Sequence, residues 1–243
     1  MRNYVPSLII GVCIIIAILI IGSAARYKFR AAETITVTGL AEQNFTSDLI
    51  VWQGSYSRKS MDLKTAFAQL KQDEVAIQQY LARKGVQAGE IVFSSHQINK
   101  EFNTRFDENG RQISQEFSGY NLTQSVRIES KDVEKIDKLS REATELIESG
   151  IEFNSSSPAY YYSKLAGMKI DLLAKASEDA RQRAETIAKN AGNDLGKLKK
   201  ANMGVFQITG QNSNEDYSYG GAFNTADKMK TGSITIKMEF SVD

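Results

Sequence analysis

The feature that most constrains this chain is an uncharged apolar run near its N-terminus. Residues 8–25 contain no charged side chain, and three basic residues follow at once between Arg26 and Arg30. A run of about 18 apolar residues is long enough to cross the hydrocarbon core of a bilayer as a helix. We therefore predict a membrane anchor or signal segment with a basic flank over residues 1–30, and a separate domain over residues 31–243.

The segment leaves two questions open. Ser23, Ala24 and Ala25 offer the small-x-small pattern of a signal-peptidase site, whereas the long isoleucine-rich core favours an uncleaved helix. Basic residues are more numerous after the segment than before it, where only Arg2 and the amino terminus lie. The positive-inside rule alone would therefore keep the following domain in the cytosol.

Composition limits the chemistry of the domain. The only cysteine, Cys13, lies inside the apolar run, so no disulfide can form within one chain and the rest has no thiol nucleophile or thiolate ligand. Beyond residue 30 the chain carries 26 basic and 29 acidic side chains. A mildly acidic surface does not neutralise phosphates, so we expect no nucleic-acid partner.

Hydrophobic periodicity predicts an α+β fold in the order β-β-α-β-β-α-β-α-β-β, with an antiparallel or mixed sheet packed by helices. A hairpin is the expected connection between the first two strands. The expected elements are strands at Ile35–Val37 and Leu49–Tyr56, a helix at Leu63–Lys84, strands at Ile91–Phe102 and Ile113–Glu129, a helix at Asp132–Ser149, a short strand at Ile151–Phe153, a helix at Ser163–Ala191, and strands at Ala201–Thr209 and Ser233–Val242.

The helix at 163–191 is the longest expected element, and its inner stripe changes from large residues to alanines such as Ala180 and Ala184. Small residues allow close approach of another element, which is either the sheet of the same domain or a helix of a second subunit. The connection 210–232 is rich in Gly, Asn, Ser and Tyr. Polar loops of this length are usually flexible or functional.

Catalytic and metal-binding patterns are weak. His96 is the only histidine, and no G-x-S-x-G elbow or other nucleophile turn accompanies it. Asp107, Glu108 and Asn109 could ligate calcium in principle, but their spacing is not that of a calcium loop and a tight turn explains them better. We predict no catalytic residues, no metal and no cofactor.

Tyr160, Tyr161 and Tyr162 form the aromatic cluster with most promise as a binding surface, since tyrosines are enriched at interfaces. The alternative is that at least two of them cover a sheet edge or the start of the following helix. Together with Ala180 and Ala184, these tyrosines are the candidate interface residues.

Several stretches resemble the SIMPL domain family. They are the opening Ile35-Thr36-Val37-Thr38-Gly39 followed by Asp48, the Lys84-Gly85-Val86 turn leading to Glu90-Ile91, Gly119-Tyr120, and a helix of the form DARxxAExxA from Asp179 to Ala188 that ends in AGxxLGK at Ala191–Lys197. The resemblance extends over residues 33–242. One departure is Ser47, where family members often have a proline, which affects the turn geometry alone.

The resemblance implies an exported bacterial envelope protein without a transferable catalytic set. Family members are secreted, periplasmic or membrane-anchored, some linked to oxidative-stress tolerance and some to ring-like oligomeric assemblies. We therefore expect a single-pass anchor through residues 8–25 with the domain in the periplasm, or secretion after cleavage near Ala25. The expected function is binding or homo-oligomeric assembly, and the ligand is unknown. The alternatives are a monomeric binding or scavenging module with a concave apolar pocket, and an unrecognised hydrolase with acids of shifted pKa near His96.

Overall fold

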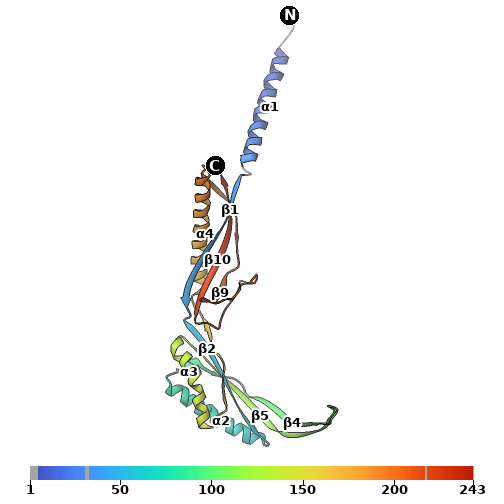
Figure 1. Cartoon of the computed structure of the whole chain (residues 1–243), viewed down its shortest axis with the longest axis vertical. Helices are drawn as coiled ribbons and strands as arrows, with labels where there is room; N and C mark the ends of the chain where they lie inside the picture. Colours follow the sequence, from blue (N-terminus) through green and yellow to red (C-terminus); the bar gives the residue numbers. More distant parts are fainter. Residues whose placement is uncertain (1–4, 31–32, 217, 243) are drawn as a thin grey trace.

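The computed structural model describes residues 5–30, 33–216 and 218–242, and within the first helix it describes the side chains of residues 10–22. The molecule is elongated, with α1 at one end and the β4–β5 hairpin at the other (Figure 1). In chain order the elements are α1 (Val5–Arg30), β1 (Thr34–Thr46), β2 (Leu49–Ser60), α2 (Leu63–Arg83), η1 (Ala88–Glu90), β3 (Ile91–Phe93), β4 (Gln97–Phe106), β5 (Gln112–Ser130), α3 (Val133–Glu142), η2 (Ala143–Ser149), β6 (Phe153–Ser155), β7 (Ala159–Tyr161), α4 (Leu165–Asn190), β8 (Leu195–Met203), β9 (Gln207–Gly210) and β10 (Met229–Val242).

The strands form two antiparallel sheets. Sheet A has the order β1-β10-β8, with β9 also paired to β10; sheet B has the order β3-β5-β2-β6, with β4 on β5 and β7 on β2. The first and last strands of the chain are neighbours, since Thr34 pairs with Ser241 and Thr46 with Met229. The α+β class is thereby confirmed, with two sheets where the sequence suggested one.

Sheet A packs one face against α4. Alternate residues of β10 and β1 point to the helix, among them Val37, Ile234 and Phe240, which are buried. On the helix side the contact is made by alanines, and a Cβ at Gly39 would lie 2.1 Å from the carbonyl oxygen of Ala176. The strand and the helix therefore touch at the backbone, which only a glycine at this position permits.

Sheet B packs against α2 and α3 with large side chains. Trp52 and Tyr56 on β2 and Leu70 and Ile77 on α2 are almost completely buried. Asp62 begins α2 as an N-cap, accepting a hydrogen bond from the backbone N–H of Thr65 at 2.8 Å. This half of the molecule has the larger core.

The half of the molecule built on sheet A and the half built on sheet B meet where β1 ends and β2 begins. The Ser47 N–H donates to the Lys228 carbonyl at 2.9 Å, and the Asp48 N–H donates to the Tyr161 carbonyl at 3.0 Å. The buried Lys230 of β10 donates from Nζ to the carbonyls of Tyr160, at 2.6 Å, and of Asn224. Backbone groups of one half are thus bonded to the other at this joint.

Several expected boundaries are wrong. The first two strands form no hairpin, because β1 pairs with β10 and β2 pairs with β5 in the other sheet. The strand expected at 91–102 is divided into β3 and β4. The one expected at 201–209 is divided into β8, which begins at Leu195, and β9. The helix expected at 132–149 is α-helical to Glu142 and then tightens into η2. A second short strand, β7, follows β6.

Helix α1 contains the apolar run, and its described side chains are mostly exposed, as Ile15 and Leu19 are at 60% and 65%. Within the residues that the structure describes, no helix reaches the combined length and hydropathy that a membrane span requires. Arg2 lies outside the described residues, and so do the side chains of the basic flank at 26–30.

Candidate functional site

The alanine stripe of α4 packs within the chain. Ala180 and Ala184 have no exposed surface and belong to the core between α4 and sheet A. Asp179 lies beside the stripe and accepts a hydrogen bond from the Leu40 N–H at 2.9 Å, which ties α4 to β1. The sequence left open whether the alanines contact the sheet of the same domain or a helix of a second subunit. In the structure they contact the sheet of the same domain.

The three tyrosines serve the joint between the halves. Tyr160 is buried, and its hydroxyl donates to Asp137 Oδ1 at 2.6 Å. Burial raises the pKa of Tyr160 to about 12, and the Asp137 carboxylate adds to the effect. Tyr162 packs against Phe45 of β1 with ring centroids 4.8 Å apart. Tyr160 and Tyr162 therefore have partners within the chain, and the buried Tyr160 has little area left for another molecule.

The side chains around His96 do not form a catalytic triad with it. Its Nε2 lies 3.8 Å from Glu74 Oε2, and its ring packs edge-on against Phe67. The hydroxyl of Ser94, the nearby serine of a possible triad, donates to the Ser95 carbonyl and not to His96. Burial alone would raise the pKa of Glu74, but hydrogen bonds from Lys71 and Gln124 lower it on balance. A carboxylate with a lowered pKa is a weak base, which is the wrong direction for proton abstraction at neutral pH.

The acidic residues at 107–109 form a turn. Asp107 Oδ1 accepts hydrogen bonds from the N–H groups of Asn109, at 2.9 Å, and Arg111, at 2.7 Å. Gly110 has a φ of 76°, as the tight reversal requires. Among the described residues, no group of three or more His, Cys, Asp or Glu side chains could hold a metal ion.

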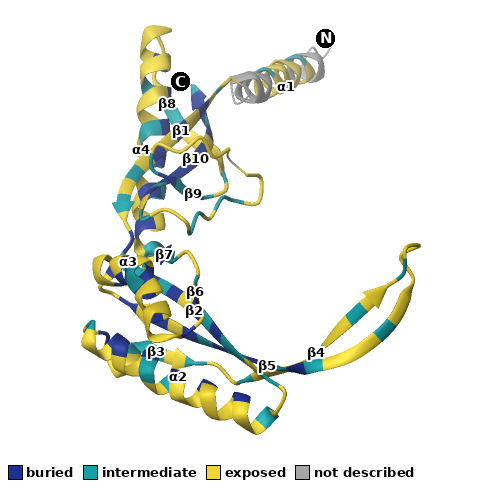
Figure 2. Cartoon of the chain, turned by 60° about the horizontal axis from the view of Figure 1, so that its bottom comes forward, coloured by how far each residue is buried: buried dark blue, intermediate teal, exposed yellow. Residues whose placement is uncertain are grey.

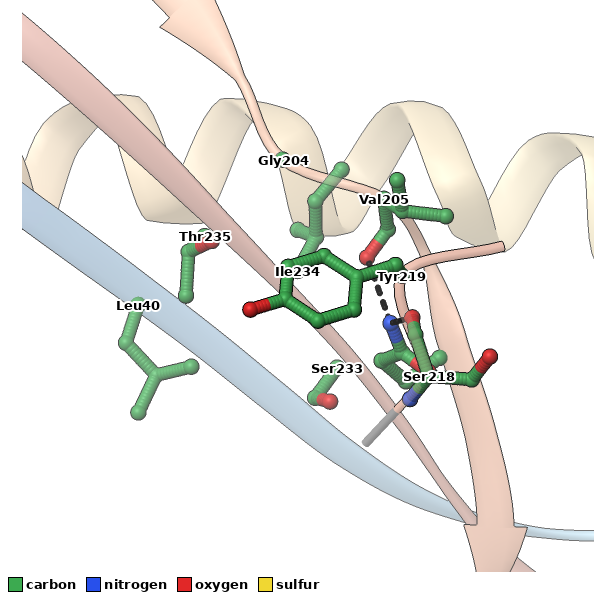
Figure 3. Close-up of a pocket in the computed structure, with 9 residues that line it drawn as sticks. Leu40, Gly204, Val205, Ser218, Tyr219, Ser233, Ile234 and Thr235 are labelled. Atoms are coloured by element: carbon green, nitrogen blue, oxygen red, sulfur yellow. Dashed lines mark hydrogen bonds between the residues drawn. The ribbon is translucent and has the colours of Figure 1, made fainter. Parts of the chain in front are cut away.

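A cavity of about 530 Å³ lies on the face of sheet A opposite α4 (Figure 3). Segments 204–207 and 218–219 close one side, and the sheet forms the floor. The lining residues are Leu40, Gly204, Val205, Gln207, Ser218, Tyr219, Ser233, Ile234 and Thr235. Tyr219 is fully exposed and stands over the cavity, as Figure 3 shows. Among these residues only hydroxyl, amide and backbone groups are polar, so the cavity suits a neutral, largely apolar molecule.

Gln207 holds the loop that borders the cavity. Its side-chain Nε2 donates to the Ser218 carbonyl at 2.8 Å, and its Oε1 accepts from the N–H groups of Ser218, at 3.2 Å, and Ala222, at 2.6 Å. Glu215 fixes the same loop to Gly210, because its carboxylate accepts a hydrogen bond from the Gly210 N–H at 2.9 Å. This hydrogen bond lowers the pKa of Glu215. The polar connection expected to be flexible or functional is therefore fastened to the sheet by side chains.

The β4–β5 hairpin projects from the body as a two-stranded ribbon (Figures 1 and 2). We call residues 97–117 the arm. No residue of the arm is buried, although it carries five large apolar side chains. Their exposed fractions are 55% for Ile98, 45% for Phe102, 61% for Phe106, 67% for Ile113 and 37% for Phe117. A group of exposed apolar side chains of this kind is typical of an interaction surface.

Local features fix the arm at its base. β5 carries Gly119 with a φ of 131°, where a Cβ would lie 2.9 Å from the Ser60 carbonyl oxygen. Beyond it the register shifts between Glu101 and Phe102. Phe117 lies between Phe102 and Tyr120. Its ring centroid is 5.8 Å from that of Phe102 and 5.1 Å from that of Tyr120. The arm thus begins from a packed aromatic base and continues without cover to its turn.

Comparison with known families decides the classification. Residues 35–243 match the family described as SIMPL, protein of unknown function (DUF541). The chain belongs to the SIMPL family. The match includes both sheets, the joint between them and the arm. No curated protein matches the chain.

In this SIMPL chain, sequence reasoning missed the arm as a surface. The alternating apolar residues of β4 and of the first half of β5 predict strands with a buried face, and nothing in them indicates that no helix covers that face. The one available signal was the concentration of Phe and Ile next to a polar turn, with no helix-forming segment between the two strands.

Proposed function

We propose that this SIMPL chain is a membrane-tethered module of the bacterial cell envelope that acts by self-assembly, with the arm as its contact surface. The observation that supports the proposal is the exposure of five large apolar side chains on a ribbon that has no cover of its own. Keeping such a surface in water is unfavourable, so its presence on the arm favours a protein contact. No catalytic step is part of this proposal.

The tether in the proposal is α1. Its described side chains at positions 10–21 are largely apolar and exposed, and β1 begins four residues after α1 ends. The domain is proposed to face the periplasm. Protease treatment of spheroplasts tests this orientation: digestion of the domain is expected, and full protection would contradict it.

Light scattering on the full chain in detergent tests the assembly. The expected result is a discrete oligomer that the double change Phe106→Ser and Ile113→Ser converts to folded monomers. Val92→Ser is the matched control, because Val92 is 62% exposed on β3, outside the arm. A wild-type chain that is monomeric at micromolar concentration would contradict the proposal.

A second candidate function rests on the cavity beside Tyr219. Its volume of about 530 Å³ is within the range of small-molecule sites, so binding of a neutral apolar ligand is the alternative to assembly. Thr235→Arg, which places a long charged side chain at the cavity, is expected to abolish the thermal stabilisation given by a ligand such as a medium-chain alcohol. Equal stabilisation of the variant and the wild type would exclude this cavity as the site.

A further inference from the structure

One edge of sheet A is open beside α4. β1 pairs with β10 on one side only. On the other side, the Leu40 N–H donates to the Asp179 carboxylate of α4 rather than to a strand. Hydrogen-bonding groups in an antiparallel strand alternate between its two sides, so the N–H and C=O groups of Thr36 and Thr38 point to the same side as those of Leu40. Within the described part of the chain, no strand pairs with them on that side.

The open edge borders a groove between β1 and α4 of about 570 Å³. Its lining combines a strand edge with apolar and polar helix side chains. The lining residues are Val37, Thr38, Asp179, Gln182, Arg183, Thr186 and Ile187. Ile187 is 48% exposed on its helix, so apolar surface is available next to the free backbone groups. A strand edge flanked by a helix suits an extended segment that adds to the sheet as a further strand.

We infer that the groove between β1 and α4 receives the arm of a second copy of this chain. This inference rests on the proposed assembly function and names the surface that the arm meets. The arm offers what the groove lacks. Among the strands that the structure describes, residues 112–119 of β5 pair with β4 alone, and β4 pairs with β5 alone, so both outer edges of the ribbon are open. Ile98 and Phe102 stand on the strand that would supply apolar contacts to Ile187.

The arm that enters the groove belongs to a second copy, because the arm and the groove of one molecule lie far apart. Figure 1 places α4 and β1 toward the α1 end and the arm at the opposite end. The contact is therefore between different surfaces of two copies, and each copy keeps one arm and one groove for further partners. Contacts of this type build rings if they close and filaments if they do not.

The apolar area of the arm agrees with an interface of this kind. Its five exposed side chains present on the order of 500 Å² of apolar surface, at ~200 Å² for a large apolar side chain. The arm alone therefore presents about half of the ~1,000 Å² that a specific interface buries in total at its lower bound.

Photo-cross-linking of the full chain in detergent tests the inference. A photoreactive amino acid replaces Ile187, and equal amounts of isotopically light and heavy protein are mixed, so that mass spectrometry separates cross-links between copies from those within one. The expected result is a mixed light–heavy cross-link to residues 97–117. A cross-link from position 187 to any other segment, or to detergent and lipid only, would overturn the inference.

Substitutions in the groove give the second readout. Ile187→Glu introduces a charge at the apolar contact, and Thr38→Pro removes an outward N–H on an edge strand, where proline is tolerated. Each is expected to reduce the mass by light scattering at least twofold, with unchanged circular dichroism. Ile170→Glu is the matched control, since Ile170 is 71% exposed on the same helix and does not line the groove.

The outcomes separate the two proposals. If the arm variants dissolve the oligomer and both groove variants leave it intact, the arm contacts another surface, and the inference fails while the proposed function stands. If the arm variants also leave the mass unchanged, the arm is not the assembly surface, and both fail.

Discussion

Sheet A and sheet B each pack one face against a long helix, yet the side chains between sheet and helix differ in size. Between sheet A and α4 the contact is made by Gly39, Ala180 and their neighbours, and the backbones nearly touch. Between sheet B and α2 it is made by residues such as Trp52 and Leu70. A stripe of small residues on a helix therefore indicates close packing, and says nothing by itself about whether the partner is the same chain or another.

The comparison predicts that sheet B is most sensitive to loss of volume. Trp52→Ala should lower the free energy of unfolding by about 3–5 kcal/mol, because it leaves a cavity in the core. It also removes the hydrogen bond that Trp52 Nε1 donates to Ser155 Oγ at 3.0 Å. Urea denaturation followed by circular dichroism measures the change, with Trp52→Phe as the milder control. A loss below about 1 kcal/mol would mean that the core of sheet B collapses around the gap.

Sheet A should instead be sensitive to a gain of volume. Gly39→Ala adds one carbon that would lie 2.1 Å from the Ala176 carbonyl oxygen and 2.6 Å from the Ala180 amide nitrogen. Since backbone atoms of α4 must move to admit it, we expect a loss of about 3 kcal/mol, at the upper end for overpacking. Gly89→Ala is the control, because a Cβ there has no atom within 4 Å. Equal effects of the two changes would remove the proposed difference between the halves.

The sequence predicted the parts of this comparison that depend on local pattern. Helix α4 ends at Asn190, one residue before the expected end at Ala191, and the tight turn expected at residues 107–109 is present. The strand expected at residues 113–129 is present within β5, and its alternating residues Leu122, Val126 and Ile128 are buried. These features follow from capping, turn chemistry and periodicity, which act over a few residues.

What the sequence did not predict depends on partners that are distant in the chain. The pairing of β1 with β10 joins residues about 200 positions apart, and no local signal distinguishes it from a β1–β2 hairpin. The same alternation that is buried at Leu122 is exposed at Phe102 and Phe106, because α2 covers only the part of sheet B near the body. For this reason the alternation alone could not show that the arm is exposed.

The next prediction concerns the joint between the halves and a smaller effect. Burial lowers the pKa of Lys230 from 10.5 to about 8, although Asp227 and Glu215 act in the opposite direction. Between pH 8 and 10.5 the unfolded chain holds the Lys230 proton and the folded chain does not. The free energy of unfolding should therefore rise with pH across this window, by about 1.4 kcal/mol per pH unit.

Urea denaturation at several pH values, with Lys230→Met as the reference, isolates this contribution. Other lysines and tyrosines titrate in both proteins, so the difference between them is the relevant quantity. The wild type should gain on the variant as the pH increases from 8 to 10.5. A difference that is constant with pH would show that the Lys230 amine stays protonated in the folded chain, held by the Tyr160 and Asn224 carbonyls.

The smallest effect on stability is expected in the arm, where sheet B continues without a helix. Phe106→Ser removes a large apolar side chain that is 61% exposed, and the free energy of unfolding should change by less than about 0.5 kcal/mol. Denaturation of this variant beside Trp52→Ala compares two aromatic residues of the same sheet, one covered and one bare. If Phe106→Ser were as destabilising as a core change, the arm would be packed within its own molecule. If the fold does not require Phe106, the result agrees with the contact between copies that we propose for the arm.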